Sequence, residues 1–496
     1  MKRLVALVAL LAAPLAGQGY RLKVDNRVQA ISYRGLELDS IAVTDTISGP
    51  SGGPTTPDGF AVRCPSGAAY CLYFRPGPVR HGAPLVTTAD LSVWGFGVSG
   101  LSAHVTARGA RDLTGDNAWP GSDPAIQLLT GYAEYNRERI TVRLGRDLNY
   151  NRLGTIGFDG GSITLRDGRR GLDASLYGGW GLARGAALPV TSPVVNPIND
   201  FQPSQRQLLL GVSAGWSGSH GDLRGEYLRE VDPHTDYFVS ERVGFSGELR
   251  PVPRWSLAAG ADYDLAAGLW GSAEATLGYA TPAVTSAVGV RRYRPHFDLW
   301  TIWGAFSPVP YNAIQAQVTV KAMPHVEIRG RGERYRFDDA GVSTPLVEVE
   351  QSGWRGELGL TATPRPEWTI DAGYTREFGP GAAVAGTSAS ITYQPSKLYA
   401  ITAHGAAMDR PLELRFSESV LHLYGIEGRI QPQPGLALEL GAERYAEQRQ
   451  RPDPAAMDWS QWRVTLRAVF SIGSSDDDLR NLPPATHRMP GGRAQR

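Results

Sequence analysis

The sequence lacks long apolar runs after its first residues, and it has no excess of charge of one sign. No apolar run after residue 17 approaches the roughly 18 residues that a membrane-spanning helix needs. The 50 Lys and Arg residues nearly balance the 49 Asp and Glu residues, which leaves a net charge of +1. This balance gives no electrostatic reason to expect a nucleic-acid partner. The composition therefore argues against a helical membrane protein and against a nucleic-acid-binding protein.

Signals of catalysis and of metal binding are also scarce. The nine His residues are scattered along the chain and form no HExxH or other metal-ligand spacing. A lone His in a loop, such as His234, is most often a solvated surface residue. We therefore expect no enzymatic activity, no metal site and no cofactor.

The N-terminus predicts export. Lys2 and Arg3 precede the apolar segment LVALVALLAAPLAG, which ends in small residues. This is the layout of a secretory signal peptide, and it is too short for a spanning helix. We assign residues 1–17 to a cleaved signal peptide and place the mature start near 17–20.

The chain has two cysteines, Cys64 and Cys71, in the segment RCPSGAAYCLY. In an exported protein this pair predicts one local disulfide that closes a small loop. A redox pair and half of a metal site are the alternatives. Both have less support, because the spacing is not CxxC and no His or Cys cluster accompanies the pair.

Strand-like segments of alternating polarity extend from about Thr87 to Gly473. In the segment Trp462–Ile472, apolar and polar residues alternate with period 2, which is the signature of a β-strand. The 59 glycines and 35 prolines fit many short strands joined by tight turns. The pattern predicts an all-β protein.

The connections between these segments alternate in length. Short turns marked by proline occur at 250–255, 280–284, 323–325, 363–368, 394–397 and 431–435. Longer polar loops occur at 111–123, 181–205, 230–236, 294–311, 338–347, 409–413 and 447–458. Such alternation is typical of a transmembrane antiparallel up-and-down β-barrel, whose two ends face different compartments.

The strand count follows from this alternation. We count 21 segments between Thr87 and Gly473, and the order of turns and loops requires an earlier strand within residues 20–80. The prediction is therefore about 22 strands, within a range of 18–24, since bacterial single-chain barrels have an even number. The stretch 299–311 either extends a strand or folds inward as a constriction loop.

Four regions result. They are the signal peptide (1–17), an N-terminal segment with the disulfide loop and the first strand (18–86), the barrel (87–473) and a disordered polar tail (474–496).

Along the predicted strands, charged residues of both signs alternate with apolar residues, so the charges share one face of each strand. The predicted interior positions are Arg143, Asp222, Arg224, Glu226, Glu327, Arg329, Arg331, Glu333, Arg355, Glu357, Glu427, Arg429, Glu439, Glu443, Arg463 and Arg467. Ionised groups avoid hydrocarbon, so this pattern indicates a hydrated interior. The charges either set the selectivity of a pore or form a mesh of ion pairs that stiffens the wall.

Aromatic residues recur beside the short turns. Trp255 and Trp368 each follow a turn with proline, and Tyr399 opens a strand after QPSK. This placement predicts an aromatic girdle at one membrane interface.

With these features the chain resembles Gram-negative outer-membrane β-barrel proteins of the porin type. The resemblance covers roughly residues 87–473 and implies insertion by the barrel-assembly machinery into outer-membrane lipid. One departure is the tail after Phe470, because such barrels usually end on a strand with a terminal aromatic residue.

The resemblance favours a porin-like channel for small polar solutes. The alternatives are a sheath or scaffold for a partner protein, such as a cytochrome electron conduit, and a plugged structural or adhesin barrel. A homo-oligomer or a periplasmic partner is a further expectation.

Overall fold

The computed structural model describes most of the chain. Described are residues 19–49, 52–114, 126–182, 207–231, 233, 238–294, 310–338, 351–379, 382–409, 419–449 and 455–474. The predicted signal peptide, the stretch 299–309 and the tail after residue 474 lie outside the described residues.

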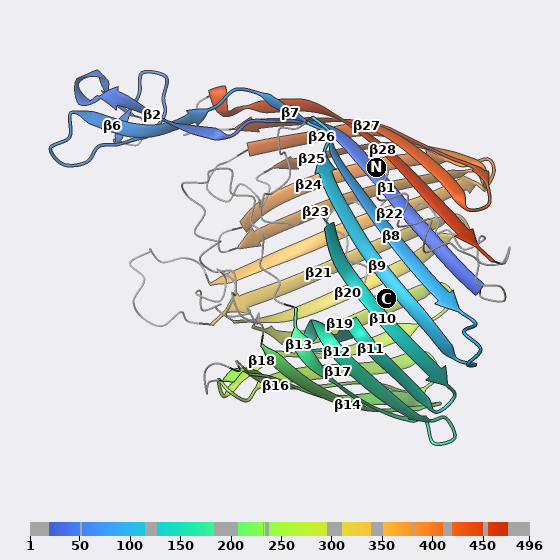
Figure 1. The fold of residues 1–496 in the computed structure, drawn as a ribbon. Helices are drawn as coiled ribbons and strands as arrows, with labels where there is room; N and C mark the ends of the chain where they lie inside the picture. Colours follow the sequence, from blue (N-terminus) through green and yellow to red (C-terminus); the bar gives the residue numbers. More distant parts are fainter. Residues whose placement is uncertain are drawn as a thin grey trace.

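The described strands form a closed 22-strand antiparallel barrel, in which each strand pairs with its neighbours in the sequence (Figure 1). This confirms the predicted architecture and strand count. The barrel strands are β1 (Gly19–Tyr33), β8 (Pro84–Trp94), β9 (Leu101–Asp112), β10 (Ile126–Arg137), β11 (Ile140–Asn151), β12 (Gly154–Asp167), β13 (Leu172–Gly181), β14 (Leu208–Gly218), β15 (Gly221–Val231), β16 (Phe238–Val252), β17 (Trp255–Asp264), β18 (Leu269–Ala280), β19 (Val284–Tyr293), β20 (Tyr311–Met323), β21 (Val326–Phe337), β22 (Ser352–Arg365), β23 (Trp368–Gly379), β24 (Ala382–Tyr393), β25 (Tyr399–Asp409), β26 (Ser419–Gln433), β27 (Leu436–Arg449) and β28 (Trp459–Gly473).

The first strand closes the barrel. Strand β1 pairs with β28 on one side, from Arg21 opposite Gly473, and with β8 on the other, from Gly19 opposite Trp94. It is the strand that the alternation of turns and loops required before Thr87. Since β1 and the start of β8 fall within 18–86, this segment is part of the barrel wall.

The two ends of the barrel differ in their connections. At the end that holds both Gly19 and Gly473, which we call the turn end, the strands are joined by turns of two to six residues. At the opposite end, the loop end, most connections are longer. Three of them, at 152–153, 265–268 and 380–381, are short, so the strict alternation inferred from the sequence does not hold there.

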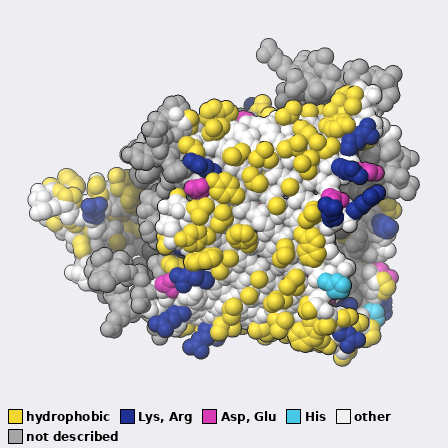
Figure 2. Space-filling view, turned by 90° about the horizontal axis from the view of Figure 1, so that it is seen from below, with side chains coloured by type: hydrophobic (Ala, Val, Ile, Leu, Met, Phe, Trp, Pro, Cys, Tyr) yellow, Lys and Arg dark blue, Asp and Glu magenta, His cyan; other side chains and the backbone are white. Residues whose placement is uncertain are grey.

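The outer face of the barrel is apolar. On β28 the outward side chains include Trp462, Leu466 and Phe470, which are 43 to 59% exposed. Figure 2 shows hydrophobic side chains over the middle of this face, with charged side chains near its two margins. Side chains that are apolar, large and exposed on every part of the wall need an apolar solvent, which only a membrane supplies.

An arm extends from the loop end between β1 and β8 (Figure 1). Its main sheet contains β2 (Leu36–Ala42), β5 (Val62–Arg63) and β6 (Tyr70–Pro76), and a second sheet pairs β3 (Ile47–Ser48) with β4 (Pro54–Thr55). A short strand, β7 (Arg80–Gly82), pairs with the end of β1. The arm contains the Cys64–Cys71 disulfide.

An ion pair and a hydrogen bond support the arm. The backbone N–H of Ser40 donates to Asp39 Oδ1 at 2.8 Å, and Arg75 Nε lies 2.8 Å from Asp39 Oδ2. The Ser40 N–H, followed by the charge of Arg75, holds the pKa of the Asp39 carboxyl below its ordinary value. The carboxylate form therefore favours the folded arm at neutral pH.

Candidate functional site

The inner face of the wall carries the charges. The strand registers place every predicted interior position on the face opposite the exposed apolar side chains. On β22, for example, Arg355 and Glu357 alternate with the outward Trp354 and Leu358. The period of two is sufficient to separate the faces, because successive side chains of a strand point to opposite sides.

An arginine crosses the seam where the chain ends meet. Arg467 on β28 donates to both carboxylate oxygens of Asp25 on β1, at 2.9 and 2.6 Å. Its third nitrogen contacts Glu439 on β27 at 3.1 Å, and Arg429 on β26 lies 3.8 Å from the same carboxylate group. These ion pairs connect four neighbouring strands across the closure of the barrel.

A second cluster surrounds Glu333 on β21. Its side chain is 1% exposed, and its Oε1 accepts hydrogen bonds from Arg291 on β19 at 2.8 Å and from Arg355 on β22 at 2.7 Å. Both arginines also donate to the hydroxyl of Tyr311 on β20, at 2.6 and 3.3 Å. Two cations thus face one buried carboxylate on the inner wall.

Arg143 on β11 has two acidic partners. It donates to Glu134 at 2.7 Å and to Asp147 at 3.3 Å, and its guanidinium group lies 4.9 Å from the ring centre of Tyr132. These contacts favour the ion-pair mesh at this position.

Other interior charges have no such partner. Within the part of the chain that the structure describes, no ion pair is formed by Asp222, Arg331, Glu357 or Glu443. The inner face therefore combines paired and unpaired charges, so each of the two interpretations made from the sequence applies to some of its positions.

One side of the barrel has a packed interior that the sequence did not indicate. Apolar side chains of the turn between β11 and β12 and of the inner face of β12 to β15 pack against each other; they are Leu153, Ile156, Phe158, Tyr177, Leu209 and Leu228. The rings of Phe158 and Tyr177 stack with centroids 5.6 Å apart. We call this region, formed by β11–β18 (teal to green in Figure 1), the packed lobe.

The turn between β11 and β12 anchors the packed lobe. Arg152 donates from its backbone N–H to Glu226 at 2.8 Å and from its guanidinium group to Glu274 at 2.9 Å. The same guanidinium group lies 3.8 Å from Asp262, and Arg242 donates to the Leu153 carbonyl oxygen at 2.9 Å. This turn at the loop end thus makes hydrogen bonds and ion pairs across the interior with residues of β15 to β18.

The packed lobe buries one of the predicted interior residues, Glu226. Glu226 is 7% exposed and is held by the Arg152 turn, so it lies inside the packing and not on an open surface. The turn itself escaped sequence analysis because NRLG has no unusual composition. The one available signal was its shortness, since a strict alternation of turns and loops would require a long loop here, where the chain has a two-residue connection.

A nucleophile motif occurs in the chain but lacks its structural context. Residues 211–215 read GVSAG, which fits the pattern GxSxG. They lie inside β14, whereas the nucleophile of that motif needs a strand-to-helix turn. The Ser213 hydroxyl contacts Ser175 at 2.6 Å and Arg224 at 3.5 Å, with no His bonded to it among the described residues.

The aromatic residues predicted as a girdle all lie at the turn end. Trp255 contacts Tyr279 with ring centres 4.9 Å apart, and Trp368 contacts Tyr393 at 4.6 Å. Tyr399 opens β25 and is 44% exposed. Each of the two tryptophans lies tilted against a tyrosine of the next strand, which gives this margin paired rings that suit an interface between apolar and polar solvent.

The described residues lack two features. They contain no group of three or more His, Cys, Asp or Glu side chains that could hold a metal ion. They also contain no helix of the length and apolarity that crossing a membrane requires.

The closed wall with an apolar outside and a charged inside defines the class of the protein. It is a 22-strand barrel of the outer-membrane type. No family model and no curated protein matches the chain.

Solved structures match the fold. A ferric enterobactin receptor mutant of Pseudomonas aeruginosa, in complex with enterobactin, is 11% identical, with a TM-score of 0.52 over 92% of this chain and 82% of the receptor. OccAB2 of Acinetobacter baumannii is 9% identical, with a TM-score of 0.41 over 92% and 98% of the two chains. OccK3 of Pseudomonas aeruginosa is 10% identical, with a TM-score of 0.39 over 92% and 96%. At identities this low, the similarity concerns the fold alone. Of the three structures, the receptor alone has a TM-score above 0.5, so the comparison of folds rests on it.

Proposed function

We propose that the protein is a channel of the Gram-negative outer membrane that admits small polar solutes. The observation that carries this proposal is the contrast between the two faces of the wall, apolar outside and charged inside. A barrel of 22 strands encloses a wide interior. An N-terminal signal peptide would direct the chain to export, and the barrel-assembly machinery would insert it, with β28 as the last strand.

The route through the barrel follows from the packed lobe. Side chains pack in the interior beside β11–β18, so we place the path of the solute beside β19–β28 and β1, β8, β9 and β10. The charges along this path are of both signs and include Glu327, Arg329, Arg331, Glu357, Glu443 and Arg463. Mixed charges at close spacing give weak selectivity between anions and cations.

Conductance in planar bilayers tests this function. The purified barrel should give stable single-channel steps with weak ion selectivity. Charged substitutions beside the open path, such as Glu357→Lys, should shift the reversal potential, whereas the same change in the arm, Glu37→Lys, should not. A folded barrel that inserts but gives no steps would overturn the proposal.

The arm favours a second candidate function, a scaffold for a partner at the loop end. One face of its sheet exposes Leu38, Tyr70 and Phe74, which are 54 to 60% exposed. Exposed apolar side chains so close together are typical of interaction surfaces. A barrel that stays closed in bilayers, and that loses a bound partner when residues 36–76 are removed, would support the scaffold over the channel.

A further inference from the structure

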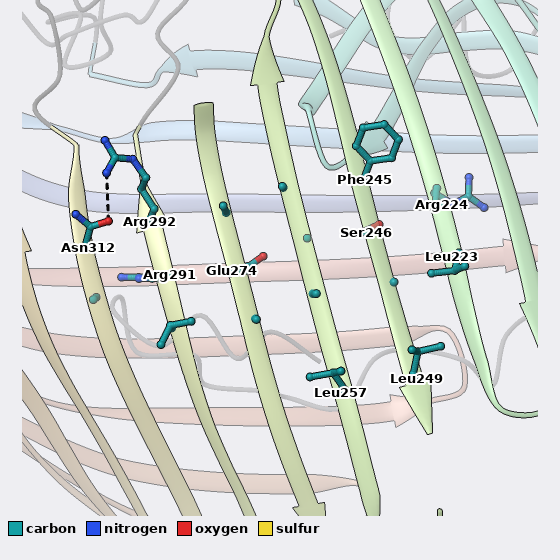
Figure 3. Close-up of a pocket in the computed structure, with 18 of the residues that line it drawn as sticks. Leu223, Arg224, Phe245, Ser246, Leu249, Leu257, Glu274, Arg291, Arg292 and Asn312 are labelled. Atoms are coloured by element: carbon teal, nitrogen blue, oxygen red, sulfur yellow. Dashed lines mark hydrogen bonds between the residues drawn. The ribbon is translucent and has the colours of Figure 1, made fainter. Parts of the chain in front are cut away.

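A hollow of about 1850 Å³ lies on the outer face of the barrel, over β13–β22 (Figure 3). Its apolar lining includes Leu223, Phe245, Leu257, Val290 and Ile314. Phe245 and Ile314 are 61 and 63% exposed and belong to the apolar outer face. The hollow is therefore separate from the interior that the proposed channel uses.

Small residues form the floor of the hollow. Gly247, Ala259 and Ala275 lie side by side on β16, β17 and β18, and Ala261 lies opposite Ala273 one row further. On the inner side of the same strands, Arg152 contacts Asp262 and Glu274. The outer surface of the wall thus carries only small residues at the place where Arg152 contacts its inner surface.

Arginines stand at the loop-end margin of the hollow. Arg292, Arg334 and Arg336 line it together with Asn312, and all belong to the outward face of β19, β20 and β21. Figure 3 shows Arg292 and Asn312 at one end of the hollow and Leu249 and Leu257 at the other. The site therefore has one cationic end and one apolar end.

Within the described residues, the charge at the cationic end is neutralised only in part. Arg292 pairs with Asp338 at 2.5 Å, and Asn312 contacts the same carboxylate group at 3.0 Å. Arg334 and Arg336 are exposed, and among the described residues neither forms an ion pair. Among the described residues, these three guanidinium groups of the outer face therefore have one carboxylate partner, Asp338, and it pairs with Arg292 alone.

The chemistry of this arrangement selects an anionic amphiphile. Guanidinium groups bind phosphate through paired, charge-assisted hydrogen bonds. Basic groups at the margin of a membrane protein attract anionic lipid headgroups. An apolar hollow directly below them accommodates acyl chains, and a free anion would leave that apolar part unused.

We propose that the hollow is a binding site for a phosphorylated lipid of the surrounding membrane. Its phosphate lies among Arg292, Arg334 and Arg336, and its acyl chains cover the floor of Gly247, Ala259 and Ala275. The inference rests on the membrane location in the proposed function, but not on conduction. If a second copy of the chain covered this face instead, its binding would not require phosphate. The test can therefore distinguish a dimer from a lipid site.

The test is native mass spectrometry of the detergent-purified full-length barrel with lipid A, which carries two phosphates and several acyl chains. The wild type should retain lipid A as a stoichiometric adduct. The double variant Arg334→Ala/Arg336→Ala should bind it roughly tenfold more weakly or worse, because it loses charge-assisted hydrogen bonds. Ala259→Phe, which fills the floor, should also weaken binding. Arg444→Ala is the matched control, since Arg444 is outward on β27, far from the hollow, and lies over Tyr424.

Several results would overturn the lipid site. They are equal binding by the double variant, an equal loss with Arg444→Ala, full retention of binding by Ala259→Phe, binding of inorganic phosphate as strong as that of lipid A, or a dimer that these substitutions break. If the double alanine variant fails to fold, Arg334→Gln/Arg336→Gln replaces it. Folding of each variant is checked by heat-modifiable migration on gels. Conductance of the same samples is measured separately, so that a barrel that binds lipid A without conducting rejects the channel alone.

Discussion

Arg152 and Glu274 are 122 positions apart, yet the guanidinium group of the first lies 2.9 Å from the carboxylate group of the second. Arg152 belongs to the turn after β11, and Glu274 lies on the inner face of β18. The Arg152 side chain is 14% exposed. The contact joins two parts of the wall that six intervening strands separate in the sheet, so it fixes the shape of the packed lobe.

Substitution of Arg152 should loosen the packed lobe. Arg152→Ala removes the cation between Asp262 and Glu274 and leaves the partly buried Asp262 without its partner, which should lower stability by about 1–3 kcal/mol. The wider interior should raise single-channel conductance and its noise. Planar-bilayer recordings and thermal unfolding measure both effects. Arg170→Ala is the control, since Arg170 is an exposed arginine at the turn end. An unchanged conductance would show that the lobe does not limit the path.

Gly260 offers an independent way to displace the same arginine. A Cβ at this position would lie 2.1 Å from Arg152 Nη1, which is the far end of a flexible side chain. Gly260→Val should therefore move the guanidinium group away from Asp262 and reproduce the conductance change of Arg152→Ala. The double variant should add little to either single variant, because both act on one contact. Additive effects would contradict this coupling.

The Glu333 cluster should affect ion selectivity. Glu333→Gln removes the one carboxylate that Arg291 and Arg355 share, so the inner wall gains net positive charge and the reversal potential should move toward anion preference. Since both arginines are part-exposed, the loss of stability should be about 1–3 kcal/mol. Reversal potentials in a salt gradient measure the shift. The control is Glu248→Gln, which changes an inner-face carboxylate beside the turn end. A shift of equal size in both variants would argue against a special role of the cluster.

The architecture could be predicted from the sequence because it depends on local signals. The alternation of Trp462 to Ile472 is complete within one strand, and the parity of turns and loops required a strand before Thr87, which is β1. The closure at Asp25 and Arg467 follows from that parity, since the first and last strands must meet.

The packed lobe and the outer hollow could not be predicted, because both depend on contacts between strands that are distant in the sequence. Arg152 looks like an ordinary turn residue, and its partners on β15, β17 and β18 share no motif with it. The small outward residues Ala259 and Ala275 resemble any weakly apolar strand positions. They form the floor of the hollow because they are paired across β17 and β18, at strands that Arg152 contacts on the inner face.

Removal of the disulfide should affect the arm and spare the barrel. The double substitution Cys64→Ser/Cys71→Ser removes a cross-link between residues seven positions apart. The loss of this constraint on the unfolded chain should lower the stability of the arm by about 2 kcal/mol. The arm should then become sensitive to protease in intact cells, while heat-modifiable migration of the barrel stays unchanged. Ser40→Ala, which keeps the disulfide, is the control. Loss of the barrel itself would show that the arm takes part in its folding.

The assignment of faces can be tested at two adjacent residues of β22. Leu358 is outward and 61% exposed, near the middle of the strand, and Glu357 is inward. Leu358→Arg would place a guanidinium group in hydrocarbon and should destabilise the barrel in lipid by roughly 2–4 kcal/mol. Glu357→Arg should leave stability nearly unchanged and shift ion selectivity toward anions. Unfolding by guanidinium chloride in vesicles measures the first effect, and reversal potentials measure the second. If both substitutions had the same effect on stability, the two faces of β22 would be equally hydrated, and a membrane-spanning barrel requires that they differ.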